Sequence, residues 1–281
     1  MNGRVCVVTG ATHGIGVATA HALAALGASV VIHGRDGARA EAVAAQVRRA
    51  SGNPEIRSAQ ADFAELAQVR RLAAQLAAQL PRLDVLINNA ALMAGARARS
   101  ADHYELTFAV NHLAPFLLTN LLLPKLRGSA PARVIIVASE AHRRATLDFD
   151  DLMNERVAGL WPAYQRSKLA NILFARELAR RLAGCGVTVN ALHPGVVNTN
   201  LFHDGPAWMR LALRSLGRLL LLSPARGADT SVYLASAPEL AGHTGGYYRR
   251  RRLIEPSPAA QSAADGERLW QQSARLTGVA A

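Results

Sequence analysis

Short runs of β-branched and other apolar residues alternate along the chain with longer segments in which apolar positions recur at helical spacing. Seven such runs predict strands, at residues 4–9, 29–32, 56–61, 83–87, 133–138, 187–192 and 245–249. The periodic segments predict helices, at residues 14–26, 38–49, 66–80, 104–126, 163–182, 226–235 and 266–276. Strands that alternate with helices are typical of βαβ units around a buried parallel sheet. We therefore expect an α/β fold, a doubly wound and mostly parallel seven-stranded sheet with helices on both faces.

The alternation continues along the whole chain without a low-complexity linker or an internal repeat, so we expect a single domain over residues 1–281. Residues 250–281 follow the last predicted strand as a C-terminal extension. Between 206 and 222, apolar residues alternate with Arg210, Arg214 and Arg218. We interpret residues 198–222 as a lid whose apolar side lines a substrate pocket. Peripheral contact with a membrane surface and a plainly packed helix are the alternatives.

The composition is that of a globular protein. Of the 281 residues, 50% are hydrophobic and 19% are charged, which excludes a wholly disordered chain. Lys and Arg outnumber Asp and Glu by 32 to 20, a net charge of +12, yet the basic run at 249–252 lacks interleaved aromatic residues. We therefore expect no nucleic-acid partner. The two cysteines and nine histidines show no metal-ligand spacing, and we expect no metal.

The N-terminal residues lead straight into the first apolar run, without the pattern of a signal peptide. The longest apolar stretches, 113–123 and 219–222, are shorter than the roughly 20 residues that a membrane-spanning helix needs. These two observations predict a cytoplasmic protein.

A glycine-rich turn, TGATHGIG at residues 9–16, lies between the first predicted strand and the first predicted helix. Glycines there let the backbone approach a pyrophosphate, and the helix N-terminus supplies unpaired N–H groups and the positive end of a dipole. A turn needed only for close packing of strand on helix would use the same glycines. The dinucleotide-binding interpretation assigns cofactor contacts to Gly10, Thr12, His13, Gly14, Ile15 and Gly16.

Residues after the next strands extend this nucleotide site. The second strand does not end in an acidic residue that could accept from a ribose 2′-hydroxyl, whereas Arg35 offers a planar fork suited to a 2′-phosphate. This predicts NADP(H) in preference to NAD(H), with a solvated surface arginine as the alternative. Asp62, with Phe63 beside it, is placed to accept from an adenine amino group. The small residues of Asn-Asn-Ala-Ala at 88–91 would let the chain pass close under the nucleotide.

Ser139, Tyr164 and Lys168 form the candidate catalytic group. Tyr164 and Lys168 are four residues apart on one predicted helix and so share a face, and Ser139 follows the fifth strand at the edge where open α/β sheets bind ligands. A phenol with a pKa of about 10 is a poor base at neutral pH unless a nearby cation favours its ionised form. Lys168 is such a cation. Tyr164 would then exchange a proton with a substrate oxygen that Ser139 holds, while hydride moves at the adjacent carbon.

In this order the motifs resemble the short-chain dehydrogenase/reductase family over nearly the whole chain. Residues 9–16 resemble its TGxxxGxG motif, 88–91 its NNAG motif with Ala for Gly, and 164–168 its YxxSK motif. Residues 167–174 and 193–199 are similar to the retinol dehydrogenase and WW-domain oxidoreductase branch. The resemblance implies a Rossmann-like fold and makes Asn111 a fourth catalytic residue, which holds a water in a proton relay through the lysine. It also implies cofactor contacts from Asn89, Ala90, Ala91, Asn111, Tyr164, Lys168, Pro194, Gly195, Val197 and Thr199.

We therefore predict an NADP(H)-dependent oxidoreductase that transfers hydride between the cofactor and the carbonyl or alcohol of a lipophilic aldehyde, ketone or alcohol. The alternative is a non-catalytic NADP(H)-binding protein that regulates a partner, against which the complete Ser, Tyr, Lys and Asn set argues. Apolar residues on more than one face of the helices around Phe116 and Phe174 suggest a homo-oligomer, although helices packed against a sheet edge could bury the same surface.

Overall fold

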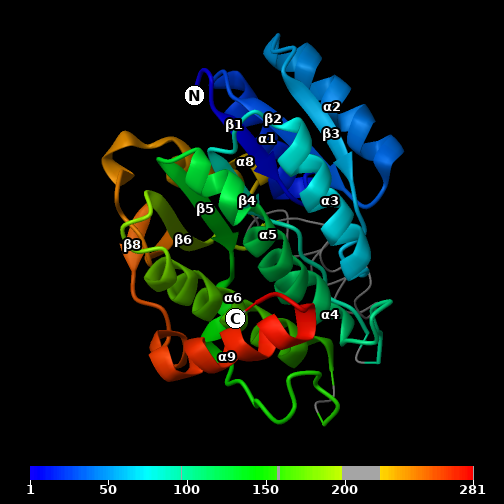
Figure 1. Ribbon diagram of the computed structural model, residues 1–281, viewed down its shortest axis with the longest axis vertical. Helices are drawn as coiled ribbons and strands as arrows, with labels where there is room; N and C mark the ends of the chain where they lie inside the picture. The colour runs from blue at the N-terminus through cyan, green and yellow to red at the C-terminus, as the bar shows by residue number, and fades with distance from the viewer. Residues whose placement is uncertain (96, 157–158, 198–221, 281) are drawn as a thin grey trace.

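The computed structural model describes residues 1–95, 97–156, 159–197 and 222–280, and its centre is one eight-stranded sheet (Figure 1). The strand order is β3-β2-β1-β4-β5-β6-β7-β8. The strands are β1 Val5–Val8, β2 Ser29–Gly34, β3 Ile56–Gln60, β4 Val85–Asn88, β5 Ala132–Val137, β6 Val187–His193, β7 Tyr247–Arg249 and β8 Arg252–Ile254. The first seven pair in parallel, and β8 pairs antiparallel with β7. The predicted doubly wound, mostly parallel α/β sheet is confirmed, with one strand more than expected.

The eighth strand comes from the run of arginines at 249–252. Arg250 and Arg251 adopt φ angles of 50° and 62°, so the chain reverses in two residues and returns as β8. A left-handed φ is unfavourable for an arginine, and two contacts offset this cost. The Arg251 guanidinium pairs with the Asp229 carboxylate, and its backbone N–H donates to Thr230 Oγ1 at 3.3 Å. The sequence pattern missed this hairpin because its turn contains no glycine or asparagine.

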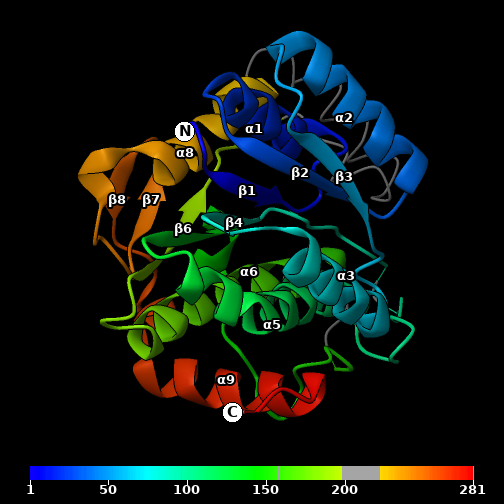
Figure 2. The same ribbon diagram turned by 45° about the horizontal axis from the view of Figure 1, so that its top comes forward.

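Helices cover both faces of the sheet, in two separate layers (Figure 2). On one face lie α1 Gly14–Ala25, α2 Gly37–Ser51 and α8 Pro224–Ser236. On the other face lie α3 Leu66–Gln79, α5 Ala114–Gly128 and α6 Leu160–Arg181. The strands alternate their buried side chains between two apolar cores, which include Val8 and Ile87 on the first face and Val7 and Leu86 on the second. Burial on both faces explains why the strands read as continuous apolar runs.

The helix predicted over 104–126 is divided into three parts. A short turn, α4 Leu106–Phe108, leads into a π-helical turn, η1 Ala109–Leu113, and then into α5. The carboxylate of Glu105 begins this segment by accepting from the backbone N–H groups of Thr107 and Phe108, both at 2.7 Å. A π-helical turn adds a residue to the helical repeat and is often found at functional sites. Here it carries Asn111.

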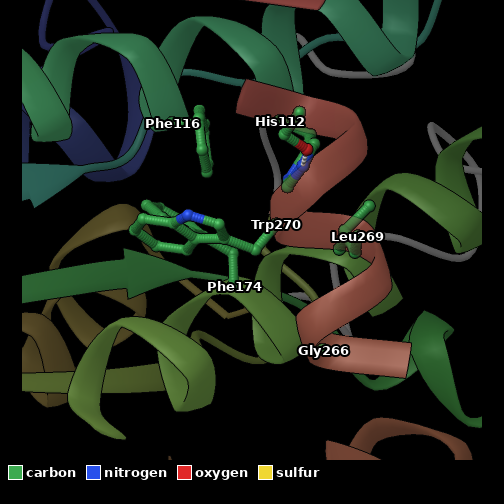
Figure 3. Close-up of a pocket in the computed structure, with 7 residues that line it drawn as sticks. His112, Phe116, Phe174, Gly266, Leu269 and Trp270 are labelled. Carbon is green, nitrogen blue, oxygen red and sulfur yellow. Dashed lines mark hydrogen bonds between the residues drawn. The ribbon is translucent and has the colours of Figure 1, made fainter. Parts of the chain in front are cut away.

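The C-terminal helix, α9 Ala263–Thr277, packs on the outer side of α5 and α6 (Figures 2 and 3). The ring of Trp270 lies 4.9 Å from that of Phe116 and 6.0 Å from that of Phe174, between centroids. The guanidinium of Arg181 covers the Trp270 ring at 4.3 Å. The apolar faces that suggested a homo-oligomer around Phe116 and Phe174 are therefore buried by the chain's own C-terminal extension.

Candidate active site

The glycine turn lies at the carboxyl end of β1, against the loop after β4. Gly10 has a φ of 61°, and a Cβ atom on it would lie 2.7 Å from Ala90 Cα, so only glycine fits. The helix that follows starts at Gly14, and the side chain of His13 makes no capping hydrogen bond to its first turn. The turn thus combines close backbone passage with helix N–H groups that the N-cap side chain leaves free, which is a fit for a phosphate-bearing nucleotide.

The side chain of Asn89 hydrogen-bonds to the backbone of this turn. Its side-chain Nδ2 donates to the carbonyl oxygens of Thr9 at 2.8 Å and Gly10 at 3.1 Å. In return Thr9 Oγ1 accepts from the backbone N–H groups of Asn89 at 2.9 Å and Ala90 at 3.0 Å. The structure therefore brings Asn89 and Ala90 to the glycine turn, and the amide of Asn89 holds the turn in shape.

Basic side chains gather beside the turn at the end of β2. Arg35 is exposed, and Arg39, in the first turn of α2, donates from Nε to the carbonyl oxygen of Thr12 at 3.3 Å. The pKa of His13 is lowered by burial first, and then by the positive charges of Arg39 and Arg35. Sequence reasoning named Arg35 and missed Arg39, although its spacing of four residues from Arg35 was a usable signal.

His33 joins the ends of three strands beneath this basic cluster. Its Nδ1 accepts from the backbone N–H of Gly10 at 3.3 Å, and its Nε2 lies 3.0 Å from the carbonyl oxygen of Ala61. Because an N–H can only donate and a carbonyl can only accept, the neutral ring carries its proton on Nε2. Burial lowers the pKa of His33 to about 4, which keeps the ring neutral.

Phe63 stacks on the His33 ring, with centroids 4.4 Å apart, and is buried. Asp62, just before it, accepts from the backbone N–H of Ala64 at 2.9 Å through Oδ1. Phe63 thus contacts His33, the residue that hydrogen-bonds to Gly10 of the glycine turn, and the adenine contacts of Asp62 and Phe63 stay a prediction. Phe63 faces the core and His33, so its contribution there is to packing under the nucleotide site.

Tyr164 and Lys168 lie on the same face of α6, behind Ser139 at the end of β5. Lys168 Nζ lies 5.5 Å from the centroid of the Tyr164 ring and donates to the carbonyl oxygen of Val137 at 3.0 Å. Both side chains are buried, at 6% and 2% exposure. Burial raises the pKa of Tyr164 to about 12, while its hydrogen bond with Ser139 acts in the opposite direction. Burial also lowers the pKa of Lys168 to about 7.

Burial disfavours the charged forms of both Tyr164 and Lys168, so it acts against the ionised tyrosine that the predicted mechanism uses. The lowering of the Tyr164 pKa by Lys168 stays a prediction. A lysine with a pKa of about 7 can accept a proton as well as donate one, which is what a relay through this residue requires.

Asn111, in the π-helical turn, hydrogen-bonds to the loop after β4 and to α6. Its Oδ1 accepts from the Leu92 N–H at 2.8 Å, and its Nδ2 donates to the Leu92 carbonyl and to Ser167 Oγ, both at 3.0 Å. Ser167 Oγ in turn donates to the carbonyl oxygen of Tyr164 at 2.8 Å. The π-helical turn thus connects the loop after β4 with the helix that carries Tyr164.

The residues predicted at the nicotinamide end follow β6. Gly195 adopts a φ of 91°, and a Cβ on it would meet the Leu222 side chain at 2.4 Å. Val197 is buried, forms a β-bridge with Leu222 and packs toward Gly227 of α8. Thr199 and the 198–221 part of the predicted lid lie outside the described residues.

Trp161 lies against Tyr164 on α6, and the sequence pattern did not identify it as a site residue. Its ring stacks on that of Tyr164 with centroids 5.7 Å apart and planes inclined by 29°. It is 46% exposed, one of few large apolar side chains that face solvent in the described parts of the chain. The signal available from the sequence was its position, one helical turn before Tyr164. An exposed aromatic surface therefore borders the buried hydroxyl.

Residues 4–210 match the short chain dehydrogenase family. Dehydrogenase/reductase SDR family member 13 of Bos taurus is 46% identical over 284 residues, which cover 99% of this chain and 74% of that protein. Retinol dehydrogenase 14 of Homo sapiens is 42% identical over 295 residues, which cover 99% of this chain and 88% of that protein. The similarity thus extends beyond the motifs to almost every element.

The prediction of a cytoplasmic location is wrong. Among the relatives is a retinol dehydrogenase, and retinol is an alcohol that dissolves in lipid rather than in water. Segment Leu106–Gly128 has 23 residues and contains an 18-residue stretch with a mean hydropathy of 1.5, so it is long and apolar enough to cross a membrane, although 78% of that stretch is buried inside this fold. The sequence estimate counted only the apolar stretch at 113–123, whereas the helical segment continues on both sides. The cytoplasmic prediction is therefore withdrawn.

Solved structures share the fold. An uncharacterized protein from Mycobacterium Paratuberculosis superposes with a TM-score of 0.79 and 34% identity over 99% of this chain and 94% of that one. The Pseudomonas aeruginosa RhlG/NADP active-site complex gives a TM-score of 0.70 and 30% identity over 88% of this chain and 94% of that one. Fold, motif order and full-length relatives agree, and the chain belongs to the short-chain dehydrogenase family, among the oxidoreductases that resemble retinol dehydrogenases.

Proposed function

We propose that the protein transfers hydride between NADP(H) and the carbonyl or alcohol carbon of a lipophilic aldehyde, ketone or alcohol. The observation that carries the proposal is the juxtaposition of Ser139, Tyr164 and Lys168 at the sheet edge that also holds the glycine turn. Both halves of the sheet contribute, because the turn follows β1 and the catalytic group follows β5. We therefore assign the activity to the chain as one domain.

Each polar side chain of the group has a separate task in this proposal. Tyr164 exchanges a proton with the substrate oxygen, and Ser139, whose side chain favours the ionised form of Tyr164, holds that oxygen. Lys168, with a pKa of about 7, passes the proton onward and binds the cofactor ribose. Asn111 supports the relay from the π-helical turn. The bound nicotinamide supplies or accepts the hydride.

The preference for NADP(H) rests on the two guanidinium groups at the glycine turn. Arg35 is exposed, and Arg39 is held against the Thr12 carbonyl, so both can reach a phosphate on the ribose next to the turn. The Pseudomonas aeruginosa relative is an NADP complex by its own description, which supports the same choice for this chain.

The substrate class rests on the apolar surroundings of the hydroxyl. Trp161 presents an exposed ring beside Tyr164, and Val196, 58% exposed, follows Gly195 at the nicotinamide end. Such surfaces favour an apolar substrate with one polar group near Tyr164. A relative named for retinol supports this chemistry.

The test is the decay of NADPH absorbance with a panel of aliphatic and aromatic aldehydes, ketones and retinal, run beside NADH. We expect turnover with NADPH. Replacing Arg35 or Arg39 by alanine should raise KM for NADPH by about tenfold or more and leave KM for NADH within about twofold, because a charge-assisted hydrogen bond is worth roughly 1.5–3 kcal/mol.

Arg57→Ala is the matched control for these two variants, since Arg57 is an exposed arginine on β3 paired with Glu55. It should leave both KM values unchanged. Equal losses with NADPH and NADH in the Arg35 and Arg39 variants would contradict the phosphate assignment. Tight NADPH binding without turnover of any carbonyl would instead support the non-catalytic alternative.

A further inference from the structure

His142 links the catalytic serine to the C-terminal extension. It lies in the short 3₁₀-helical turn Glu140–Arg144, for which Ser139 is the N-cap, and it is fully buried. Its Nδ1 lies 2.6 Å from the carbonyl oxygen of Ser139, and its Nε2 accepts from the backbone N–H of Ser257 at 3.0 Å. One imidazole ring thus joins two residues that are more than a hundred positions apart.

The two partners determine the protonation of the ring. A backbone N–H can only donate, so Nε2 carries no proton, and the neutral ring must carry its proton on Nδ1. From there it donates to Ser139, whose carbonyl can only accept. Burial lowers the pKa of His142, in agreement with a neutral ring. A proton on Nε2 would place two donors face to face.

Further contacts hold the same turn. Arg143 donates from Nη2 to the carbonyl oxygen of Glu255 and from Nε to Oε2 of Glu140, both at 2.8 Å. The Tyr247 hydroxyl donates to Oε1 of Glu140 at 3.1 Å. The Tyr247 ring also packs edge-on against His142, with centroids 5.1 Å apart. Residues 255–257, which we call the C-terminal strap, are therefore attached to the serine turn at two points.

We propose that the C-terminal strap positions Ser139 through His142, and that the extension is needed for turnover and not only for folding. His142 and Ser257 are positioning residues, since they act through Ser139. This inference rests on the proposed function, because it assumes that Ser139 holds the substrate oxygen. It goes beyond that function by making a distant segment set the geometry of the catalytic group.

The test exploits the backbone of Ser257. Its φ of −63° is the angle that proline adopts, so Ser257→Pro suits the backbone, removes the N–H donor and turns the proline Cδ toward His142 Nε2, which breaks the link between the strap and the serine turn. Ser257→Ala is the matched control, because the buried Ser257 hydroxyl has no hydrogen-bond partner among the residues that the structure describes. We expect kcat to fall about tenfold in Ser257→Pro, since small displacements of a positioned group are costly, with KM and Kd for NADPH unchanged. Ser257→Ala should stay within about twofold of the wild type.

A merely structural role would lower Tm and cofactor affinity and leave kcat per folded molecule the same, and this result would overturn the proposal. A second measurement uses the unmodified protein, in which ¹⁵N chemical shifts of the His142 ring distinguish the two tautomers. A proton on Nε2 of His142 would also overturn the proposal. If the wild type reduces no carbonyl at all, the proposed function itself has failed, and this is seen before any variant is compared.

Discussion

Burial determines the acid–base state of the polar side chains around Tyr164. A buried phenol keeps its proton and a buried ammonium loses it more readily, because both charged forms lose solvation. In the chain alone this effect is larger than any attraction between Lys168 and Tyr164, whose pKa values are about 7 and about 12. The environment thus opposes the ionised form of Tyr164, and its residue type alone does not determine its acid–base state.

Removing the Tyr164 hydroxyl tests its role directly. We expect Tyr164→Phe to lower kcat by about 10³-fold, within the range for loss of a general acid or base, while Kd for NADPH from fluorescence titration stays within about twofold.

Tyr104→Phe is the control for the loss of a phenol elsewhere. It removes a hydrogen bond of 2.9 Å to the Leu276 carbonyl, so it should lower stability slightly and leave kcat alone. Normal turnover by Tyr164→Phe would rule out the assigned mechanism.

The ring of Trp161 offers a second test at the level of a single side chain. Because it stacks on Tyr164 and is half exposed, Trp161→Ala should raise KM for aromatic and long apolar aldehydes by up to about tenfold, the value of one aromatic contact. KM for short aliphatic aldehydes should change little, and Trp161→Phe should restore most of the loss. An equal drop of kcat with every substrate would show instead that Trp161 only holds Tyr164 in place.

At the scale of elements, two features depend on contacts that local patterns do not encode. The arginine hairpin adds β8 because Asp229 of α8 neutralises Arg251. Helix α9 covers α5 and α6. On α6, Glu177 is 4% exposed and accepts hydrogen bonds from Arg180 and Arg181. Glu267 of α9 accepts hydrogen bonds from the same two arginines, so these ion pairs join α9 to α6.

The contribution of α9 can be measured with one residue. Trp270→Ala removes the ring that covers Phe116 and Phe174 and should lower the free energy of unfolding by about 3 kcal/mol or more, as for other buried aromatic residues. The urea midpoint reports this change. Trp161→Ala, the loss of an exposed tryptophan, should cost about 1 kcal/mol or less. Equal effects of the two substitutions would mean that α9 adds little to stability.

At the scale of the whole molecule, buried neutral histidines make stability depend on acidity. Burial lowers the pKa of His33 to about 4 and that of His112 to about 3. The unfolded chain takes up protons on these residues near pH 6.5 and the native chain does not, so their contribution is complete above pH 6.5 and decreases as the pH falls toward 4.

We therefore expect the urea midpoint to decrease steadily from pH 6.5 to 4, with about 3 kcal/mol lost for each of these two histidines. His33→Gln should make the dependence less steep, because it removes one of the two buried histidines. A midpoint that does not change between pH 6.5 and 4 would contradict this account.

Local sequence determined the order of strands and helices, the glycine turn and the shared face of Tyr164 and Lys168. Each of these follows from a period or a spacing within about one element, where backbone geometry alone decides which side chains are neighbours. The motif order was also enough to identify the family and to name Ser139, Asn111 and Arg35 as candidates.

Only the tertiary structure decided which distant residues support them. His33 reaches Gly10 and Ala61, Arg39 reaches Thr12, and His142 reaches Ser257. It also decided that α9 covers the apolar side of α5 and α6 and that β7 continues into β8. These contacts depend on how strands and helices pack, and a hydrogen bond between residues far apart in the chain leaves no period or spacing in the sequence from which it could be predicted.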